Sequence, residues 1–257
     1  MAHSPDRLAA DLAALGIRFG DVLMVHASLS ALGRVEGGAE GVVEALVAAI
    51  GADDPDGGTL LLPGFRGSLC VPGRHRELPA PLHEKAQHLS QWLPPDETPT
   101  TMGAIPEAFR RRPGTLRSPH PTDAYLANGP KAAALCAAHS LPFGTGPGSP
   151  AGRLYEWDAK QLLLGVGFNR LTQLHHAETR LAHGRRKTRI LPLEDRTVLL
   201  EDAGDDLDVH FPEIGRRFLA AGHGWQGKVG DGAAVLVTTR AIDDFALDYL
   251  AHALLPG

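Results

Sequence analysis

The chain has 257 residues, of which 43% are hydrophobic and 21% are charged, a composition typical of a globular protein. A formal net charge of −5 argues against the basic surface with which proteins bind nucleic acids or anionic membranes, so we expect neither partner. No apolar run approaches the ~18 residues of a membrane span, and two isolated cysteines, Cys70 and Cys136, favour a reducing compartment such as the cytoplasm.

Helix and strand signals alternate along the N-terminal part of the chain. Ser4 followed by Pro5 predicts a helix start, and leucines at the helical spacing continue it to a stop at Gly16. Short apolar runs predict strands at 21–26 and 58–63, with a helix between them at 39–50.

Residues 64–101 contain many prolines, glycines and charges and show little periodicity. The segment is too long for a plain connection inside a compact domain. It is therefore predicted to be either a lid that faces the substrate or an ordered surface excursion.

The second half continues the alternation, with no internal repeat, low-complexity linker or domain boundary. Helices are expected at 104–111, 131–139, 154–157, 212–220 and 241–253, and extended segments near 124 and at 162–166, 190–193, 197–202 and 234–238. This order predicts one domain over residues 1–257, a layered α/β/α fold. Because the C-terminal strands follow one another closely, part of the sheet is expected to be antiparallel.

The stretch QLLLGVGFNRLTQLHHAE, residues 161–178, concentrates the chemistry of the chain. An apolar strand ends at glycines 165 and 167 and leads into a helix that carries His175 and Glu178. Ligands often bind at such strand ends in α/β sheets. The two side chains, three residues apart, share a helix face, so the carboxylate can orient the imidazole as a base. A polar pair on a solvated face explains the spacing equally well.

Thr172 is the expected N-cap of this helix, so His175 falls in the first turn, where the helix dipole disfavours a charged imidazolium. The neighbouring His176 points away from that face and is expected at the surface or at the rim of the site. A metal site from His175, His176, Glu178 and His183 is disfavoured, because the His-Glu-x-x-His motif needs histidines four residues apart.

A second candidate segment is VHASLSALG, residues 25–33. Ser28 and Ser30, with nearby N–H groups at the end of a strand, could hold a phosphate, or they form only a local turn and helix cap. His26 lies at the same strand end, where it either faces the cleft of His175 or is a core histidine.

Four segments in order carry a resemblance to a known family: VHASLSALG at 25–33, MGAIPEAFRRRPGTLRSPHP at 102–121, GPGSPAGRLYEWDAKQLLLGVGF at 146–168 and LTQLHHAE at 171–178. Together they resemble the aminoglycoside 3-N-acetyltransferases, or antibiotic N-acetyltransferases, whose fold differs from that of the GNAT acetyltransferases. The resemblance spans most of residues 5–190.

The resemblance implies an acetyl transfer from acetyl-CoA to the 3-amino group of a 2-deoxystreptamine aminoglycoside, a reaction of antibiotic resistance that requires no metal. It implies that His175 is the general base, that Glu178 orients it, and that His26 belongs to the site. The residues implied to contact coenzyme A are Ser28, Leu29, Ser30, Gly33, Met102, Gly103 and Phe168.

The chain departs from the family pattern in two places. Family members often carry a serine three residues after the His-Pro dipeptide, where this chain has Ala124; the adjacent Asp123 is the candidate contact for a cationic sugar. Leu171 replaces the asparagine that usually precedes the threonine. A polycation needs carboxylates at the cleft, and the candidates, most of which have surface solvation as an alternative role, are Glu36, Asp123, Asp205, Asp206 and Asp208.

Other functions stay open at this point. The acceptor could be another antibiotic amine or an aminophosphonate. The histidines could instead serve a metal-dependent hydrolase, or the chain could bind a coenzyme without catalysis. A homodimer is also compatible with the sequence.

Overall fold

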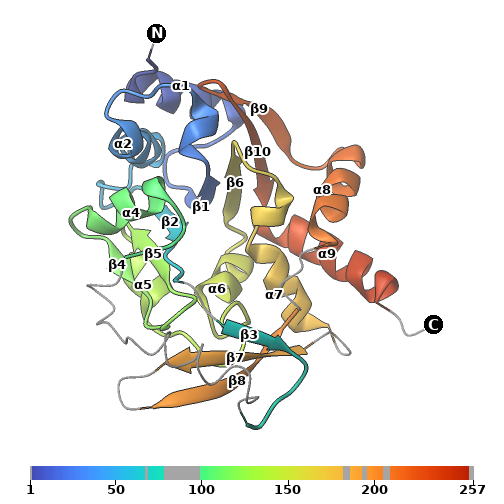
Figure 1. The fold of residues 1–257 in the computed structure, drawn as a ribbon. Helices are drawn as coiled ribbons and strands as arrows, with labels where there is room; N and C mark the ends of the chain where they lie inside the picture. Colours follow the sequence, from blue (N-terminus) through green and yellow to red (C-terminus); the bar gives the residue numbers. More distant parts are fainter. Residues whose placement is uncertain are drawn as a thin grey trace.

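The computed structural model describes residues 2–66, 69–77, 99–181, 186–192, 196–204 and 209–254. In this part of the chain a seven-stranded sheet has the order β4-β5-β2-β1-β6-β10-β9, and a three-stranded sheet has the order β3-β7-β8. Figure 1 shows helices on both sides of the larger sheet and the smaller sheet below it.

The N-terminal elements follow the sequence signals closely. They are α1 (Pro5–Leu15), β1 (Val22–Ala27), α2 (Gly38–Ile50) and β2 (Thr59–Pro63). The Ser4 hydroxyl accepts a hydrogen bond from the Arg7 N–H at 3.3 Å and caps α1, and Gly16 ends the helix in the left-handed conformation.

The later elements also match the expected order. They are α4 (Ala104–Arg111), β4 (Leu116–Arg117), β5 (Tyr125–Asn128), α5 (Ala132–Cys136), α6 (Pro150–Glu156), β6 (Lys160–Leu164), α7 (Gln173–Arg180), α8 (Phe211–Ala220), β9 (Trp225–Val229), β10 (Gly232–Thr238) and α9 (Thr239–Ala253). β4 and β9 were not predicted, because both edge strands are mostly exposed or half-buried and neither has an apolar run.

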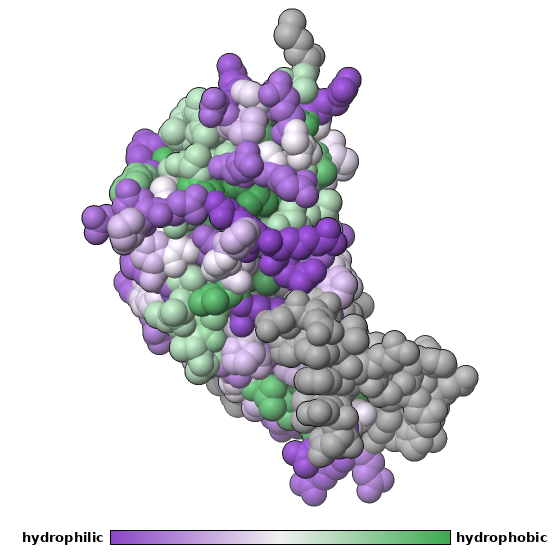
Figure 2. Space-filling view, turned by 90° about the vertical axis from the view of Figure 1, so that its left-hand side faces the viewer, coloured by the Kyte–Doolittle hydropathy of each residue, from purple (hydrophilic) through white to green (hydrophobic). Residues whose placement is uncertain are grey.

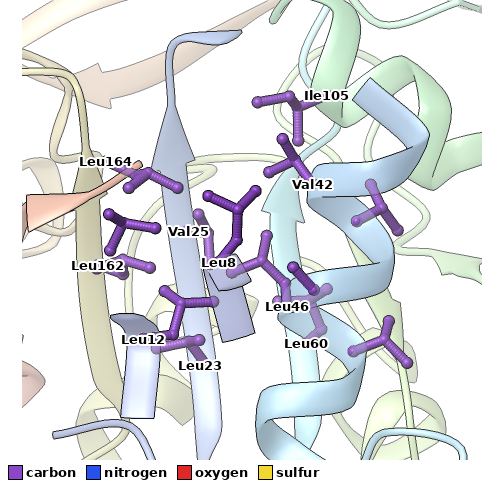
Figure 3. Packing of buried hydrophobic residues seen from close by; sticks show 14 of the residues in the cluster. Leu8, Leu12, Leu23, Val25, Val42, Leu46, Leu60, Ile105, Leu162 and Leu164 are labelled. Carbon is purple, nitrogen blue, oxygen red and sulfur yellow. The ribbon is translucent and has the colours of Figure 1, made fainter. Parts of the chain in front are cut away.

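Alternating side chains of the strands supply the two cores of a three-layer fold. Leu23 and Val25 of β1 face α1, α2 and α4, in the cluster that Figure 3 shows from close by. Val22 and Met24 of the same strand face α5 and α6 on the other side, where α7, α8 and α9 cover β6 and β10. This period of two confirms the α/β/α prediction.

The larger sheet is mixed, as expected. Its centre, β2-β1-β6, is parallel. β5 and β4 continue it antiparallel on one side, and β10 and β9 do so on the other. The carboxyl ends of the three parallel strands therefore meet at one edge, and neighbouring connections leave that edge on opposite faces of the sheet, as at the ligand-binding edge of other α/β folds.

The smaller sheet joins distant parts of the chain. β3 (Leu69–Pro72) pairs antiparallel with β7 (Arg186–Pro192), which pairs with β8 (Thr197–Ala203). β3 belongs to the predicted lid at 64–101, of which 67–68 and 78–98 lie outside the described residues. The two ends of that segment meet where the Thr101 N–H donates to the Phe65 carbonyl at 2.9 Å.

The surface of the described part is of mixed polarity. Figure 2 shows hydrophilic and hydrophobic residues interspersed on the face that forms the left-hand side of Figure 1. None of the helices in the described ranges is both long and apolar enough to cross a bilayer.

Candidate functional site

A cavity of about 650 Å³ opens at the edge where the parallel strands end. Its wall combines segments that follow β1, β2 and β6 with the start of α4 and residues of α7 and α8. The lining residues used below are His26, Ser28, Leu29, Ser30, Phe65, Thr101, Met102, Gly103, Asn169, Arg170, Leu171, Thr172, His175 and Phe211. Its volume lies in the range of pockets for small molecules and cofactors.

The wall after β1 depends on a close approach to the end of β6. The Ser28 N–H donates to the Leu164 carbonyl at 2.9 Å. Gly165 follows with a φ of +68°, and a Cβ at this position would lie 2.4 Å from the Cβ of Ala31. Only glycine adopts this backbone conformation readily and leaves room for Ala31. This is why the strand-turn-helix segment predicted from the sequence has a glycine at position 165.

His175 and Glu178 form the dyad that their spacing predicts. The His175 Nδ1–H donates to Glu178 Oε2 at 2.8 Å, within one turn of α7. The His175 side chain is 23% exposed and lines the cavity, whereas the Glu178 side chain is only 6% exposed. A covered carboxylate that accepts from Nδ1 fixes the tautomer and leaves the lone pair on Nε2, the arrangement of an oriented general base.

Two features hold the His175 ring at the cavity. Thr172 precedes α7, and its carbonyl accepts the His175 N–H at 3.0 Å, so the histidine lies in the first turn as expected. The Thr172 side chain makes no cap hydrogen bond. The buried ring of Phe211 meets the imidazole edge-on, with 4.9 Å between ring centroids. Phe211 is the first residue of α8, so the site also needs this helix.

The prediction that His176 lies at the surface or rim is wrong. Its side chain is buried, and its Nδ1 lies 2.7 Å from Asp243 Oδ2 on α9. The same carboxylate accepts from Gln173 at 2.8 Å and from Arg180 at 2.6 Å. The face of α7 opposite the cavity is thus bonded to a fully buried aspartate, which anchors the helix that carries the dyad.

His26 both faces the cavity of His175 and is buried like a core histidine, so it meets both alternatives that its sequence context leaves open. It lines the cavity, yet only 5% of its surface is exposed, and its buried Nε2 has no hydrogen-bond partner among the residues that the structure describes. Burial lowers its pKa to about 3, so the ring is neutral at physiological pH. A buried polar atom without a partner is unfavourable, and a ligand group in the cavity could provide one.

Five of the seven residues predicted to contact the coenzyme line the cavity: Ser28, Leu29, Ser30, Met102 and Gly103. The hydroxyl oxygens of the two serines lie 3.1 Å apart, so one bonds to the other in this state.

The other two lie behind the wall. Gly33 has a φ of +78°, and a Cβ there would overlap the Asp231 side chain. Phe168 is buried among the residues of α7, α8 and α9, where Gly215 makes room for its ring. Both positions support the segments that form the wall, and neither is among the lining residues.

The two predicted substrate carboxylates in the described part of the chain, Asp123 and Glu36, are not among the lining residues either. Asp123 is buried and pairs with Arg189 at 3.0 Å, because β7 brings that arginine against the segment before β5. Glu36 is exposed between β1 and α2. The remaining candidates, Asp205, Asp206 and Asp208, lie outside the described residues.

Sequence reasoning missed several lining residues. Phe65 and Thr101 lie at the ends of the segment 64–101, whose predicted role as a lid was the one signal for them, and Phe211 lies on a segment without a catalytic motif that only the fold brings to the cavity. Asn169 and Arg170 had a usable signal, since they occupy the glycine-rich entrance to α7. Arg170 is the only charged residue with a permanent positive charge among those that line the cavity in the described part of the chain.

The described residues contain no group of three or more His, Cys, Asp or Glu side chains arranged to hold a metal ion. His183, a member of the metal set considered from the sequence, lies outside them. Nδ1 of His175 bonds to Glu178, whereas Nδ1 of His176 bonds to Asp243. The two histidines therefore serve separate faces of α7.

Comparisons with known proteins point in one direction. A family model described as aminoglycoside 3-N-acetyltransferase matches residues 24–251. The aminoglycoside N(3)-acetyltransferase VII of Streptomyces paromomycinus is 35% identical, with 96% of this chain and 91% of that protein covered. The AAC-IIIb structure with CoASH has a TM-score of 0.82, 31% identity and 98% of each chain covered. AAC-VIa bound to sisomicin has a TM-score of 0.83, 30% identity, and 98% and 99% covered.

Proposed function

The chain belongs to the aminoglycoside 3-N-acetyltransferase family, so it is an acyltransferase with acetyl-CoA as its co-substrate, and we propose that it acetylates the 3-amino group of 2-deoxystreptamine aminoglycosides. The observation that carries this proposal is the His175–Glu178 dyad at the wall of the cavity. We further propose that the reaction proceeds by direct transfer and takes place in the cytoplasm.

The chemistry requires a neutral amine. An alkylammonium has no lone pair with which to attack a thioester, and such amines are mostly protonated near neutral pH. Nε2 of His175 takes a proton from the acceptor nitrogen, and the Glu178 carboxylate stabilises the imidazolium that forms. The nitrogen then bonds to the acetyl carbonyl carbon, and the carbon–sulfur bond breaks. The sulfur leaves as the thiol with the proton that the nitrogen loses on becoming an amide, and the imidazolium releases its own proton to solvent. A positioned base contributes about 10²–10⁴-fold to such a rate, and holding both substrates together contributes more.

The wall of the cavity suits the thioester arm of the coenzyme. Among its described lining residues are the serines that follow β1, the backbone at Gly103 and the side chain of Met102, and none is acidic. Such a mixture can bind an amide-containing arm through hydrogen bonds and apolar contacts. Arg170 is available for a phosphate. The related AAC-IIIb structure, which contains CoASH, supports this use of the fold.

His26 has a defined place in the proposal. Its ring is neutral, and within the described ranges of the chain its buried Nε2 has no hydrogen-bond partner. We assign it a hydrogen bond to the acetyl-CoA arm next to the dyad, rather than a proton transfer, because a group with a pKa near 3 is a weak base at neutral pH.

The acceptor binds on the side of His175 away from the coenzyme. AAC-VIa bound to sisomicin supports an aminoglycoside as the acceptor. The carboxylates that would pair with its ammonium groups are assigned to the stretch around 205–208, which holds three aspartates. Asp123 and Glu36 stay weaker candidates, since Arg189 already pairs with the first and the second lies outside the cavity lining.

A second candidate acceptor is an aminophosphonate. Arg170 and the absence of acidic side chains among the described lining residues favour an anionic group in the cavity. The phosphates of the coenzyme would explain the same positive charge at Arg170. The aminoglycoside and the aminophosphonate are therefore distinguished by which of them raises the rate of thiol release.

The test is a thiol-release assay with acetyl-CoA against a panel of aminoglycosides and one aminophosphonate. We expect His175→Ala to lower kcat by about 10²–10⁴-fold while coenzyme A binding, measured by calorimetry, is retained. His252→Ala, an exposed histidine on α9, is the matched control and should keep the parental rate. A His175→Ala variant with parental activity would refute the base assignment, and a parent that is inert towards every amine would refute the proposed function.

A further inference from the structure

Glu178 is a carboxylate on α7 whose position depends on a different part of the fold. Its side chain is 6% exposed, so its neighbours leave it little freedom. One of these neighbours is Gly204, directly after β8 of the smaller sheet. A Cβ on Gly204 would lie 2.5 Å from Glu178 Oε2, the atom that accepts from His175, and 3.1 Å from its Cδ. The main chain at Gly204 therefore packs directly against the carboxylate.

The end of β8 is itself held in place. The Ala203 N–H donates to Asp202 Oδ1 at 2.9 Å, and Arg189 of β7 donates to Asp202 Oδ2 through Nε at 2.9 Å and Nη2 at 2.7 Å. Arg189 also pairs with Asp123, which precedes β5 of the larger sheet. All three side chains are buried. A continuous set of charged hydrogen bonds thus fixes the end of β8 relative to the central sheet.

We propose that Gly204 is a positioning residue for the acetyl transfer, because it holds the Glu178 carboxylate against the His175 imidazole. The Asp123–Arg189–Asp202 cluster fixes the strand end that presents it. Gly204 is not among the residues that line the cavity, so its role is exerted through Glu178. This inference rests on the proposed function for its kinetic consequences, whereas the contact itself is independent of any activity.

Glycine is required at this place for two reasons. Its φ of +79° is one that other residues adopt only with strain, and a side chain would enter the space of the carboxylate. In Gly204→Ala the Glu178 carboxylate must move, because the alternative is to displace a strand end that Arg189 and Asp202 hold. Movement of Oε2 lengthens or breaks its hydrogen bond with His175 Nδ1.

The chain offers a matched control for the backbone effect. Gly222, after α8, has a φ of +82°, and a Cβ built on it meets no atom within 4 Å. Gly222→Ala therefore introduces the same strain without a contact. The difference between the two alanine variants isolates the contact with Glu178.

The kinetic test compares Gly204→Ala with Gly222→Ala in the thiol-release assay with an aminoglycoside acceptor. We expect Gly204→Ala to lower kcat by about ten- to a hundredfold, the effect of misplacing a catalytic group by roughly 1 Å, with an unchanged KM for acetyl-CoA. Gly222→Ala should keep the parental kcat. In a Glu178→Gln background, Gly204→Ala should cost no further rate, because its target is already lost.

A spectroscopic test needs no turnover. An imidazole Nδ1–H that donates to a carboxylate gives a downfield proton NMR signal, here assigned by its loss in His175→Gln. We expect Gly204→Ala to shift or abolish that signal and Gly222→Ala to retain it. If Gly204→Ala keeps both the signal and the parental kcat, the inference is overturned while the proposed function stands. If the parent acetylates no amine, the proposed function fails, and the NMR comparison still decides whether Gly204 positions the dyad.

Discussion

His26 makes the stability of the protein sensitive to acid, and the effect can be worked out from its burial. In the folded state its pKa is lowered from 6.5 to about 3, because the ring is buried. The unfolded chain takes up a proton near pH 6.5, whereas the folded protein does not do so until about pH 3. Protonation therefore favours the unfolded state over this interval, and the free energy of unfolding falls as the pH falls.

The magnitude follows from the two pKa values. Each pH unit between them costs about 1.4 kcal/mol, so moving from pH 7.5 to pH 5 removes about 2 kcal/mol through His26 alone. His139, which is buried beside Ser118 and has a pKa also lowered to about 3, contributes a similar separate loss.

The perturbation is His26→Leu, which replaces the imidazole by an apolar side chain of similar size. Urea unfolding curves at pH 7.5 and pH 5 give the free energy of unfolding of parent and variant at each pH. We expect the loss between these pH values to be about 2 kcal/mol smaller in the variant, whatever its absolute stability. Equal losses in parent and variant would refute the reasoning, because they would mean that the His26 ring is protonated equally easily in the folded and unfolded states.

Two further predictions concern the supports of the site. Gly165→Ala should weaken binding of coenzyme A, measured by calorimetry, because its Cβ would overlap Ala31; the double variant with Ala31→Gly should recover part of the affinity, and no recovery would contradict this contact. Asp243→Ala should lower the free energy of unfolding in urea by about 3 kcal/mol, since it leaves Arg180 and His176 without their shared buried acceptor. A loss below about 1 kcal/mol, the contribution of an exposed ion pair, would contradict this prediction.

Local patterns in the sequence were sufficient for most of the architecture. Helix caps such as Ser4, apolar runs such as those of β1 and β2, and the alternation of strands with helices predicted a layered mixed α/β fold, because these signals reflect interactions between residues close in the chain. The spacing of His175 and Glu178 also predicted their hydrogen bond, since one helix turn brings such a pair together.

Other residues of the site could not be assigned in this way. The sequence placed His176 at the surface, but α9 brings Asp243 against it and buries it. The sequence predicted that Asp123 contacts the substrate, but β7 brings Arg189 against that carboxylate, and the two side chains form an ion pair. Phe211 and Gly204 reach the dyad from α8 and from the end of β8, more than twenty residues further along the chain.

The sequence by itself determined which residues can form a base and its carboxylate partner, because that pairing is contained in one turn of helix. Only the tertiary structure decided which side chains cover the dyad, which charges are already paired, and that Nε2 of His26 in the cavity wall has no partner in the described part of the chain. The physical reason is that burial and electrostatic pairing depend on the neighbours that packing supplies, and these neighbours come from segments distant in the chain.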